Sequence, residues 1–470
     1  MLGETKRNLS PEEKRFFYLS VFTVALLLGS VLPQHTLART WYIKADGTGD
    51  APTIQAGVDS AAVGDTVLVG AGTYTDTTYV AIYTVPVPVN VHLYKNISLI
   101  GETAPPGVVI SGVYSAAAIY VHDVDSTALI ESFRIRREDP YIQCILDAAS
   151  KTAPDVTLQA GSGINCRRAS VQIVGNELVD LGYGVRIEGS SPSIRNNHFL
   201  RTVAGVSATG ETTVEIADNY FETFYVAISG SECSARIVGN EIQGNTNSCE
   251  GISFLDAVLY VSHNVIRNTQ YNGLSLASNQ AVSRAIIEHN WIEGVSWDAL
   301  YLSYCNQTSV RWNTFVWNNI AFDIQGSSDV IIENNTVDGA GIGMLVDLDS
   351  NSAIRGNIIN RATDGITCVG GGNPTVECND VFEATRRYSG CPDQTGLNGN
   401  IALDPEFCGI DNSGNYFLQS DSPCAPANHP DGYNCGLIGA HEVNCGKVDA
   451  AQKSWGSIKS LYREEESHDR

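Results

Sequence analysis

The chain is poor in basic residues. It has 29 lysines and arginines against 52 aspartates and glutamates, which gives its 470 residues a formal net charge of −23 at pH 7. A surface with this excess of negative charge repels phosphate backbones and anionic lipid headgroups. The composition therefore disfavours nucleic acids and anionic membrane surfaces as partners, and it leaves cations and neutral or basic ligands open.

The patterns of several common protein classes are also missing. Twelve cysteines are present, none of them before Cys144, but no Cys-x-x-Cys pair or Cys/His pairing of the zinc type occurs. Apolar residues do not recur with the 3.6-residue period of helical repeats, and the pattern of leucine-rich repeats is absent. These absences exclude zinc modules and both helical and leucine-rich solenoids.

What is present is one short phrase that returns ten times between Gly163 and Cys391. It consists of an apolar residue, two variable residues, an asparagine, a variable residue and an apolar residue. The asparagines lie 21 to 26 residues apart, at positions Asn176, Asn197, Asn219, Asn240, Asn264, Asn290, Asn313, Asn335, Asn357 and Asn379. A second phrase of the type small-apolar-x-apolar precedes each asparagine by 13 to 17 residues, as in Gly184-Val185-Arg186-Ile187.

A fixed period with two strand-like pieces per repeat predicts a β-solenoid. One coil cannot bury its apolar face alone, but coils stacked at about the 4.8 Å spacing of strands share a continuous core. An asparagine that points into this core is costly to bury unless its amide is hydrogen-bonded. We therefore interpret the ten asparagines as a structural ladder and not as ligands.

The first 38 residues are typical of a secretory signal. Four basic residues precede the apolar run Phe16–Leu32, and Thr36-Leu37-Ala38 fits a cleavage site. A membrane anchor is the alternative, because the run is near the length that spans a bilayer. We expect cleavage, a secreted or cell-surface (extracellular) location, and no membrane span in the mature chain.

The cysteine distribution predicts disulfides, since exported chains commonly contain them. Cys144 and Cys166 are 22 residues apart, about one coil, so they could stack on each other. Six cysteines crowd the last quarter of the chain: Cys378, Cys391, Cys408, Cys424, Cys435 and Cys445. Their pairing cannot be deduced from the sequence.

Residues 41–69 resemble a segment of a known family. Trp41-Tyr42-Ile43 is followed by Pro52-Thr53-Ile54-Gln55-Ala56 and then by Asp65-Thr66-Val67-Leu68-Val69. This order resembles the N-terminal cap of secreted bacterial right-handed parallel β-helix proteins of the pectate-lyase-like superfamily. In that family the Thr-Ile-Gln-Ala segment is a short helix that plugs the open end of the solenoid.

The repeats and the resemblance together predict an all-β fold, namely a right-handed parallel β-helix (solenoid) with an N-terminal helical cap and a Cys-rich C-terminal cap. Two segments rich in proline, 76–92 and 137–162, are expected to leave the barrel as loops, and smaller insertions at 244–250 and 278–284 could wall a groove. The expected divisions are a signal peptide over 1–38, a cap and first coil over 39–75, the β-helix over 76–391, a disulfide-stapled cap over 392–446 and a C-terminal tail over 447–470.

The catalytic signatures of related families are missing. The Asn-Thr-Asp, Asp-Asp, Gly-His-Gly and Arg-Ile-Lys motifs of polygalacturonase-like hydrolases do not occur. The long Gly-x-Val-Asp motif of pectin methylesterases and the Asp-Pro-His of mannuronan epimerases are absent as well. Whether the protein is an enzyme therefore stays open, and if it is one, we expect a polysaccharide lyase or a glycoside hydrolase.

Candidate catalytic residues come from the outward positions of the second phrase. On consecutive coils these positions hold Tyr301, then Asp323, then Asp347. Two carboxylates on adjacent coils can divide the acid and base roles of glycoside hydrolysis. They could also share a calcium ion, which is the candidate cofactor. The alternative is that they are two solvated acids on a very acidic protein.

Aromatic residues gather on neighbouring coils. Four of the six tryptophans fall within residues 291–317, and the position before the asparagine holds an aromatic ring on three consecutive coils. Sugar rings bind by stacking on exposed aromatic faces, although some of these rings could instead fill widened turns. The candidate substrate-binding residues are His263, His289, Trp291, Trp297, Trp312 and Trp317.

Two functions remain open from the sequence. The first is an exported protein that binds a polysaccharide or cell-surface glycan on its lateral face and, if it is an enzyme, cleaves or modifies it. The second is a non-catalytic, adhesin-like or structural solenoid. We expect a monomer in either case.

Overall fold

The computed structural model describes residues 38–445 apart from six gaps, namely 83–84, 113–116, 138–160, 245–248, 280–282 and 411–414. From Thr40 onward the chain forms one compact unit. Residues 1–37 of the predicted signal peptide, the predicted tail over 447–470 and Cys144 lie outside the described residues. Within the described ranges, no helix is both long and apolar enough to cross a bilayer.

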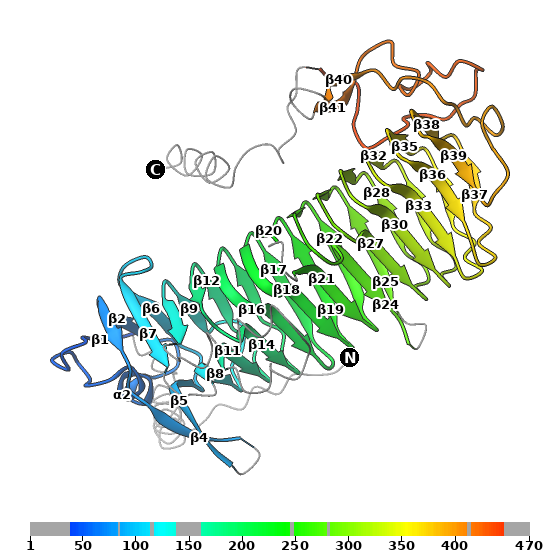
Figure 1. Ribbon diagram of the computed structural model, residues 1–470. Coiled ribbons are helices and arrows are strands. Elements are labelled where there is room, and N and C mark those ends of the chain that lie inside the picture. The colour runs from blue at the N-terminus through cyan, green and yellow to red at the C-terminus, as the bar shows by residue number, and fades with distance from the viewer. Residues whose placement is uncertain are drawn as a thin grey trace, which may run out of the picture. The chain divides into compact units, whose positions relative to one another are not determined.

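The chain winds into a parallel β-solenoid whose coils follow one another from the blue to the yellow end of the ribbon (Figure 1). Each regular coil contributes one strand to each of three stacked sheets. Sheet 1 has fourteen strands: β1 (Thr40–Ile43), β2 (Thr66–Val69), β6 (Ser98–Gly101), β9 (Leu129–Glu131), β12 (Gln172–Val174), β15 (Ser193–Arg195), β17 (Thr213–Ala217), β19 (Ser234–Val238), β22 (Val258–Ser262), β25 (Arg284–Glu288), β28 (Ser309–Arg311), β31 (Ile331–Glu333), β34 (Ala353–Arg355) and β37 (Thr375–Glu377).

Sheets 2 and 3 share two long strands, β16 (His198–Thr209) and β18 (Tyr220–Ser231), which run through both. The other strands of sheet 2 are β3 (Gly72–Tyr74), β7 (Val108–Gly112), β10 (Arg134–Arg137), β13 (Glu177–Val179), β20 (Glu241–Gln243), β23 (Val265–Arg267), β26 (Trp291–Glu293), β29 (Thr314–Val316), β32 (Thr336–Asp338), β35 (Ile358–Asn360) and β38 (Asp380–Phe382). The other strands of sheet 3 are β5 (Val85–Leu93), β8 (Ala117–His122), β11 (Ser162–Arg167), β14 (Tyr183–Glu188), β21 (Glu250–Leu255), β24 (Leu274–Ala277), β27 (Asp298–Ser303), β30 (Ile320–Gln325), β33 (Ile342–Asp347), β36 (Asp364–Cys368) and β39 (Arg386–Ser389).

The repeat pattern predicted two strands per coil, and the structure has three. The strand of sheet 1 precedes the ladder asparagine, the strand of sheet 2 follows it directly, and the strand of sheet 3 carries the small-apolar-x-apolar phrase. Most strands of sheet 2, such as β26 and β29, are only three residues long. A two-residue alternation cannot be recognised over three residues, which explains why the sequence did not reveal this sheet.

The ten predicted asparagines form a continuous hydrogen-bonded ladder at the corner between sheets 1 and 2. The Nδ2 atom of Asn313 donates to Oδ1 of Asn335 at 3.0 Å and to the carbonyls of Ile287 and Arg311 at 2.9 Å. All ten side chains are at most 2% exposed. The prediction that these residues are structural is confirmed by this arrangement.

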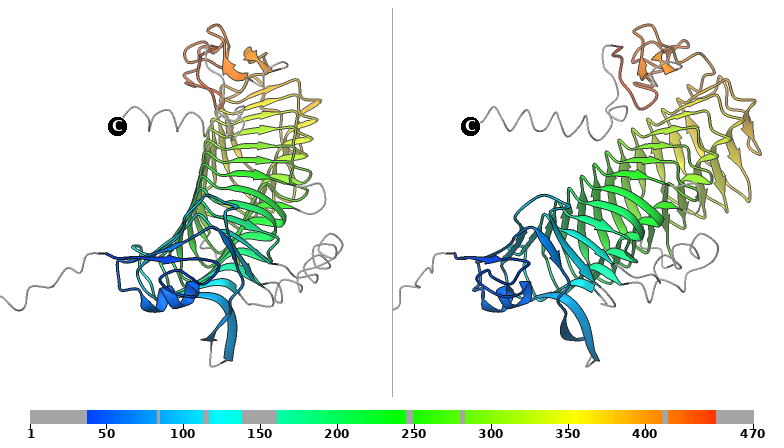
Figure 2. Two further views of the ribbon diagram at one scale, coloured as in Figure 1. Left: turned by 90° about the vertical axis from the view of Figure 1, so that its left-hand side faces the viewer. Right: turned by 60° about the vertical axis from the view of Figure 1, so that its left-hand side comes forward.

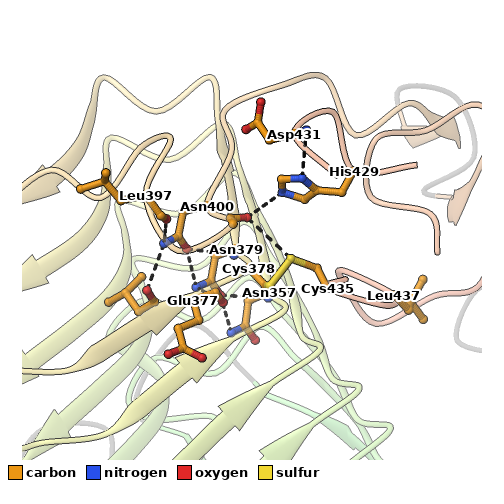
Figure 3. Close-up of a disulfide and its surroundings, with 12 residues drawn as sticks. Asn357, Glu377, Cys378, Asn379, Leu397, Asn400, His429, Asp431, Cys435 and Leu437 are labelled. Carbon is orange, nitrogen blue, oxygen red and sulfur yellow. Dashed lines mark hydrogen bonds between the residues drawn. A yellow bond between two sulfur atoms is a disulfide. The ribbon is translucent and has the colours of Figure 1, made fainter. Parts of the chain in front are cut away.

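The ladder extends one coil beyond the predicted end of the repeats. Nδ2 of Asn379 donates to Oδ1 of Asn400 at 3.1 Å, and Asn400 is fully buried (Figure 3). The prediction that the regular array ends at Cys391 is therefore wrong by one rung. The sequence carries the same phrase there, because Leu397 and Ala402 occupy its apolar positions around Asn400.

The described ranges contain one α-helix, α2 (Ile54–Ser60), near the first coils (Figure 2). The Thr53 hydroxyl accepts a hydrogen bond from the backbone N–H of Ala56 at 3.1 Å and so caps the helix. The helix buries Ile54, Gly57 and Val58. A Cβ atom at Gly57 would lie 2.7 Å from Cδ1 of Ile43 in sheet 1, so only glycine permits this close approach.

The prediction of a loop over residues 76–92 is wrong. Strand β4 (Thr78–Ile82) pairs antiparallel with the first part of β5, and the remainder of β5, from Val89, joins sheet 3 beside β8. Pro86 and Pro88 lie in the part of β5 that pairs only with β4, where a missing N–H disturbs no sheet ladder on the other side. The central parts of the other predicted excursions, 138–160, 245–248 and 280–282, lie outside the described residues.

Three disulfides lie near the end of the chain, and one of them attaches the C-terminal segment, residues 401–445, to the solenoid. They join Cys368 to Cys391, Cys378 to Cys435 and Cys408 to Cys445. The second of these links the segment to the position just before Asn379 of the ladder (Figure 3). Strands β40 (Phe407–Gly409) and β41 (Asn415–Leu418) form a small antiparallel pair within the segment.

The C-terminal segment also packs against the outer side of sheet 2. The backbone N–H groups of Gly439 and Ala440 donate to the carbonyl of Gly356 at 2.7 Å and to Oγ1 of Thr336 at 2.9 Å. An apolar cluster forms beneath it from Trp291, Val316, Ile358, Ile401, Phe407, Tyr416, Leu418, Cys424 and Ile438. The outer side of sheet 2 is therefore partly occupied by the chain itself, whereas on sheet 3 a smaller apolar cluster lies at the first coils, where Val80 of β4 packs with Val89, Ala117 and Tyr120.

Candidate functional site

The predicted acid pair lies on the outer side of sheet 3. Tyr301 of β27 is next to Asp323 of β30, and Gln325 of β30 is next to Asp347 of β33. The two aspartates thus lie on adjacent strands, as the register predicted. The hydroxyl of Tyr301 donates to Oε1 of Gln325 at 3.3 Å, and Nε2 of Gln325 donates to Oδ2 of Asp323 at 3.0 Å.

The two aspartates differ in their surroundings. Asp323 is only 6% exposed, and its Oδ1 atom has no hydrogen-bond partner within the described part of the chain. Burial raises the pKa of Asp323, and the charge of Asp347 adds to this effect, while the hydrogen bond from Gln325 opposes it. Asp347 accepts a hydrogen bond from the backbone N–H of Leu348 at 2.6 Å and so stabilises the following turn. The two residues are therefore not a pair of equivalent solvated acids.

A line of three polar side chains was not identified from the sequence. Glu250, Asn272 and Asp298 occupy the same position on three consecutive coils, at the entrance to sheet 3. The backbone N–H of Gly251 donates to the carbonyl of Asn272, and that of Gly273 donates to the carbonyl of Asp298, both at 3.0 Å. We call these three residues the polar line.

The sequence concealed the polar line because the turns that lead into sheet 3 differ in length. The one available signal was the pairing of an aromatic residue with a polar one in Tyr271-Asn272 and in Trp297-Asp298.

The acids of this region hold protons more strongly than ordinary carboxyls. Burial, together with the charge of Asp323, raises the pKa of Asp298 to about 6. Burial also raises the pKa of Glu250, against hydrogen bonds from Ser253 and Asn272. Paired, partly buried carboxyls of this kind are frequent in binding and catalytic sites, although structural networks produce them too.

Exposed aromatic rings follow the corner between sheets 2 and 3, and two of them, Tyr271 and Trp297, directly precede Asn272 and Asp298 of the polar line. The exposed fractions are 41% for Tyr225, 37% for Tyr271, 54% for Trp297 and 57% for Trp317. The rings of Tyr271 and Trp297 meet edge to face, with centroids 5.2 Å apart. Trp317 lies over Gly339 of the next coil, where an added Cβ atom would come within 2.3 Å of the ring. We call these four residues the aromatic row.

Three of the predicted binding residues form a separate stack at the ladder corner between sheets 1 and 2. The ring centroids of His263 and His289 are 5.0 Å apart, and those of His289 and Trp312 are also 5.0 Å apart. All three residues have a positive φ, between 55° and 56°. Burial and the charge of His263 lower the pKa of His289. The structure brings these residues together, but on a different corner from the aromatic row.

Trp291 belongs to neither surface. Its side chain is 7% exposed and lies under the C-terminal segment, with its ring centroid 5.7 Å from that of Tyr416. Its Nε1 atom donates to Glu293 at 3.0 Å. A ring that is already covered on this side of sheet 2 cannot stack on a sugar, so we leave Trp291 out of the site.

The described ranges hold no group of three or more His, Cys, Asp or Glu side chains that could bind a metal ion. The calcium hypothesis therefore depends on Asp323 and Asp347 alone. Calcium normally takes six to eight oxygen ligands, so these two carboxylates would need several further ligands from elsewhere.

The fold has relatives among solved structures. An exopolygalacturonase from Thermotoga maritima matches 62% of this chain and 81% of its own, with 13% identity and a TM-score of 0.42. A mannuronan C-5 epimerase module from Azotobacter vinelandii matches 75% and 94%, with 14% identity and a TM-score of 0.43. The Dettilon tailspike protein matches 76% and 67%, with 14% identity and a TM-score of 0.45. At these identities the likeness is one of fold alone.

No curated protein sequence matches the chain. The family model described as the right handed beta helix region matches residues 162–297 and 251–417, which together span more than half of the sequence. This match agrees with the three parallel sheets and the internal ladder. The chain therefore belongs to the right-handed parallel β-helix family.

Proposed function

We propose that this protein binds a polysaccharide or cell-surface glycan along the outer side of sheet 3. The observation that carries the proposal is the position of the exposed rings of Tyr271 and Trp297 next to the polar line. Aromatic rings provide flat apolar faces on which the C–H face of a sugar can stack. Partly buried carboxyl and amide groups beside them can hydrogen-bond the sugar hydroxyls and fix the orientation of the chain.

The solenoid suits a repeating ligand because it places similar positions at the regular spacing of parallel strands. The aromatic row covers several coils, so successive sugars of one glycan chain can meet successive rings. Large rings gathered on an exterior that is otherwise polar point to an interaction site. The outer side of sheet 2 offers no comparable surface in its later coils, since the C-terminal segment packs there.

We further propose that the protein is exported, acts as a monomer, and has both ends of its solenoid closed. Export is supported by the basic and apolar start of the chain and by the three disulfides. Helix α2, which packs Ile54 and Val58 into the core, is the candidate plug at the N-terminal end. The C-terminal segment is the candidate cover at the other end.

The binding test compares aromatic variants in retention on insoluble polysaccharides. We expect the double variant Tyr271→Ala with Trp297→Ala to lose retention, because each ring contributes on the order of 1 kcal/mol. Trp312→Ala is the matched control, since this ring lies on the other corner and should be dispensable. Far-UV spectra establish that each variant is folded.

Two outcomes would contradict the proposal. If only Trp312→Ala loses binding, the site is the histidine and tryptophan stack at the ladder corner. If the unaltered protein binds none of a broad set of glycans, the non-catalytic structural or adhesin-like function is favoured instead.

A second candidate function, hydrolysis of the bound glycan, is supported by the pair Asp298 and Asp323. Burial and the charge of Asp323 raise the pKa of Asp298, as a general acid requires, while a neighbouring ionised carboxylate can assist water. Release of reducing ends from a bound glycan should be lost in Asp298→Asn while retention persists. Unchanged release in this variant would contradict the assignment.

A further inference from the structure

The carboxylates of the proposed binding face lack the cationic partners that acids have elsewhere on this solenoid. Five acids on the other surfaces form ion pairs: Asp180 with Arg201, Glu215 with Arg195, Glu288 with Arg311, Glu333 with Arg355, and Asp338 with Arg361. On sheet 3 itself, Asp364 of a later coil pairs with Arg386 of the next strand. Within the described ranges, Glu250, Asp298, Asp323 and Asp347 have no ion pair with lysine, arginine or histidine.

The strands themselves explain this difference. Seven consecutive stretches of sheet 3 contain no lysine, arginine or histidine, namely 204–209, 226–231, 250–255, 274–277, 298–303, 320–325 and 342–347. These seven stretches thus carry no positive charge, and four of them contain an acid, namely Glu250, Asp298, Asp323 and Asp347.

The fold does not require acids at these positions. The position of the polar line holds Ala204 and Val226 on the coils before Glu250, and Ile320 and Ile342 on the coils after Asp298. On the coil after Ile342 the position holds Asp364, which is paired with Arg386. Apolar residues therefore satisfy the backbone at this place, and the acids without an ion pair lie beside the aromatic row.

The fold does not require an acid at the position of Asp323 either. The coil directly before it holds Tyr301 there, and the four coils before that hold serine, as Ser207, Ser229, Ser253 and Ser275. A small neutral residue therefore fits this column. Asp323 is only 6% exposed, and in the described structure its Oδ1 atom has no hydrogen-bond partner.

Holding several carboxyls together in a partly buried region without a cation is unfavourable. Desolvation and mutual repulsion both disfavour their charged forms, and the raised pKa values of Glu250, Asp298 and Asp323 express this cost. A positive charge brought by a ligand would offset both effects. The same field repels a polyanion.

We propose that the glycan bound on sheet 3 is a cationic amino-sugar polymer, whose free ammonium groups supply the partners that Glu250, Asp298 and Asp323 lack. This inference rests on the proposed glycan-binding function and specifies its ligand. Sugar rings stack on the aromatic row while ammonium groups meet the polar line. Polyuronates are rejected because their carboxylates face the same charge.

Binding of an ammonium group should also change the protonation of the protein. A neighbouring positive charge stabilises the ionised form of a carboxyl and lowers its pKa. Near the pKa of Asp298, about 6, a fraction of the protein must therefore lose a proton when the ligand binds. A neutral glycan has no such effect.

The experiment titrates the full protein with three oligosaccharides of equal length by calorimetry, at a pH near 6 and at low salt. They are a glucosamine oligomer with free amines, its N-acetylated form and a galacturonic acid oligomer. We expect the free amine to bind at least about tenfold more tightly than the acetylated form. We expect this advantage to shrink at high salt and the binding to release protons, seen as a dependence of the heat on the buffer.

The variants assign the effect to named groups. Glu250→Gln and Asp298→Asn should remove most of the preference for the free amine, while they weaken binding of the acetylated oligomer much less, because the new amides can still hydrogen-bond sugar hydroxyls. Glu377→Gln is the matched control, because it removes one exposed acid from sheet 1 and should leave the preference unchanged.

The experiment distinguishes a wrong ligand class from a wrong binding function. Equal affinity for the free and acetylated oligomers, or tighter binding of the uronate with or without calcium, overturns the charge inference while glycan binding through Trp297 stands. Absence of any binding that depends on Trp297 overturns the proposed function itself.

Discussion

At the scale of single residues, the corner between sheets 1 and 2 is held by one asparagine per coil. Asn313 makes two donor bonds to backbone carbonyls and one to Asn335, and its own Oδ1 atom accepts from both N and Nδ2 of Asn290 at 2.9 Å. The residue before each such asparagine has a positive φ, for example Trp312 at 55°. The amide therefore stabilises a turn that is otherwise unfavourable.

Replacement of Asn313 by leucine should destabilise the protein by more than about 2 kcal/mol. The change leaves several buried backbone and side-chain groups without partners, and each unsatisfied group costs about 1–3 kcal/mol. Equilibrium unfolding measures the loss. Asn351→Leu, at an exposed position, is the control, and equal stability of the two variants would contradict the ladder.

A second feature of single residues is an aromatic ring that packs on a glycine of the next coil. Trp317 covers Gly339, which has φ +70°, and Tyr304 covers Gly326, which has φ +55°. These rings remain more than half exposed. The glycines are required both by their backbone conformation and by the ring above them.

Gly339→Ala should displace the ring of Trp317. A Cβ atom there would lie 2.3 Å from Trp317, whereas at Gly175, with φ +64°, nothing lies within 4 Å. Both substitutions impose the left-handed backbone cost of about 1 kcal/mol, so the additional loss in Gly339→Ala measures the clash alone. Unfolding curves and tryptophan fluorescence follow it, and identical behaviour of the two variants would argue against the stacked geometry.

At the scale of elements, the C-terminal segment is docked on sheet 2 through a buried polar group. The Tyr416 hydroxyl donates to Oδ2 of Asp338 at 2.7 Å, and Asp338 is fully buried in an ion pair with Arg361. Apolar contacts with Trp291 and Val316 surround this bond. The segment therefore has its own specific anchor in addition to its disulfides.

Tyr416→Phe should weaken this docking by about 1.5–3 kcal/mol, since it removes a hydrogen bond to a buried charge. Limited proteolysis should then cut residues 401–445 faster, while the coils keep their resistance. Tyr433→Phe, at a tyrosine that is 48% exposed, should not change the cleavage rate. Equal rates for both variants would mean that the disulfides and apolar contacts alone hold the segment.

At the scale of the whole molecule, some buried aspartates keep their protons to a higher pH than aspartates in an unfolded chain. Burial raises the pKa of Asp380 to about 7, against hydrogen bonds from Cys424 and from the backbone N–H of Leu403. The pKa of Asp298 is raised to about 6. Both values lie above the pKa of about 3.9 that an aspartate has in an unfolded chain.

The contribution of these two aspartates to stability should therefore fall as the pH rises from about 4 to about 7, whereas the lowered pKa values of His92, His122 and His289 act in the opposite direction. Over this range the folded state retains protons that the unfolded state has lost, so each aspartate lowers the free energy of unfolding by about 1.4 kcal/mol per pH unit until its folded pKa is passed. Asp380→Asn should flatten this slope, because the amide oxygen still accepts from Leu403 but does not titrate. A slope that is unchanged in Asp380→Asn would refute the assignment.

The sequence by itself determined the coil, the ladder and the register of the later strands. The placement of Asp323 and Asp347 on adjacent strands and the burial of the asparagines follow from a period that repeats over ten coils. In a solenoid each coil contacts mainly its two neighbours, so a local pattern is sufficient to predict the stacking.

Only the tertiary structure determined which residues are neighbours at the corners of the coils and in the C-terminal segment. The polar line of Glu250, Asn272 and Asp298 was hidden because the asparagine spacing varies from 21 to 26 residues, so the turns do not align by counting. Trp291 is removed from the surface by Tyr416, and Thr314 contacts His441 across 127 residues of sequence. Contacts over such separations depend on how the last segment folds back on the finished sheet, and no local period encodes that.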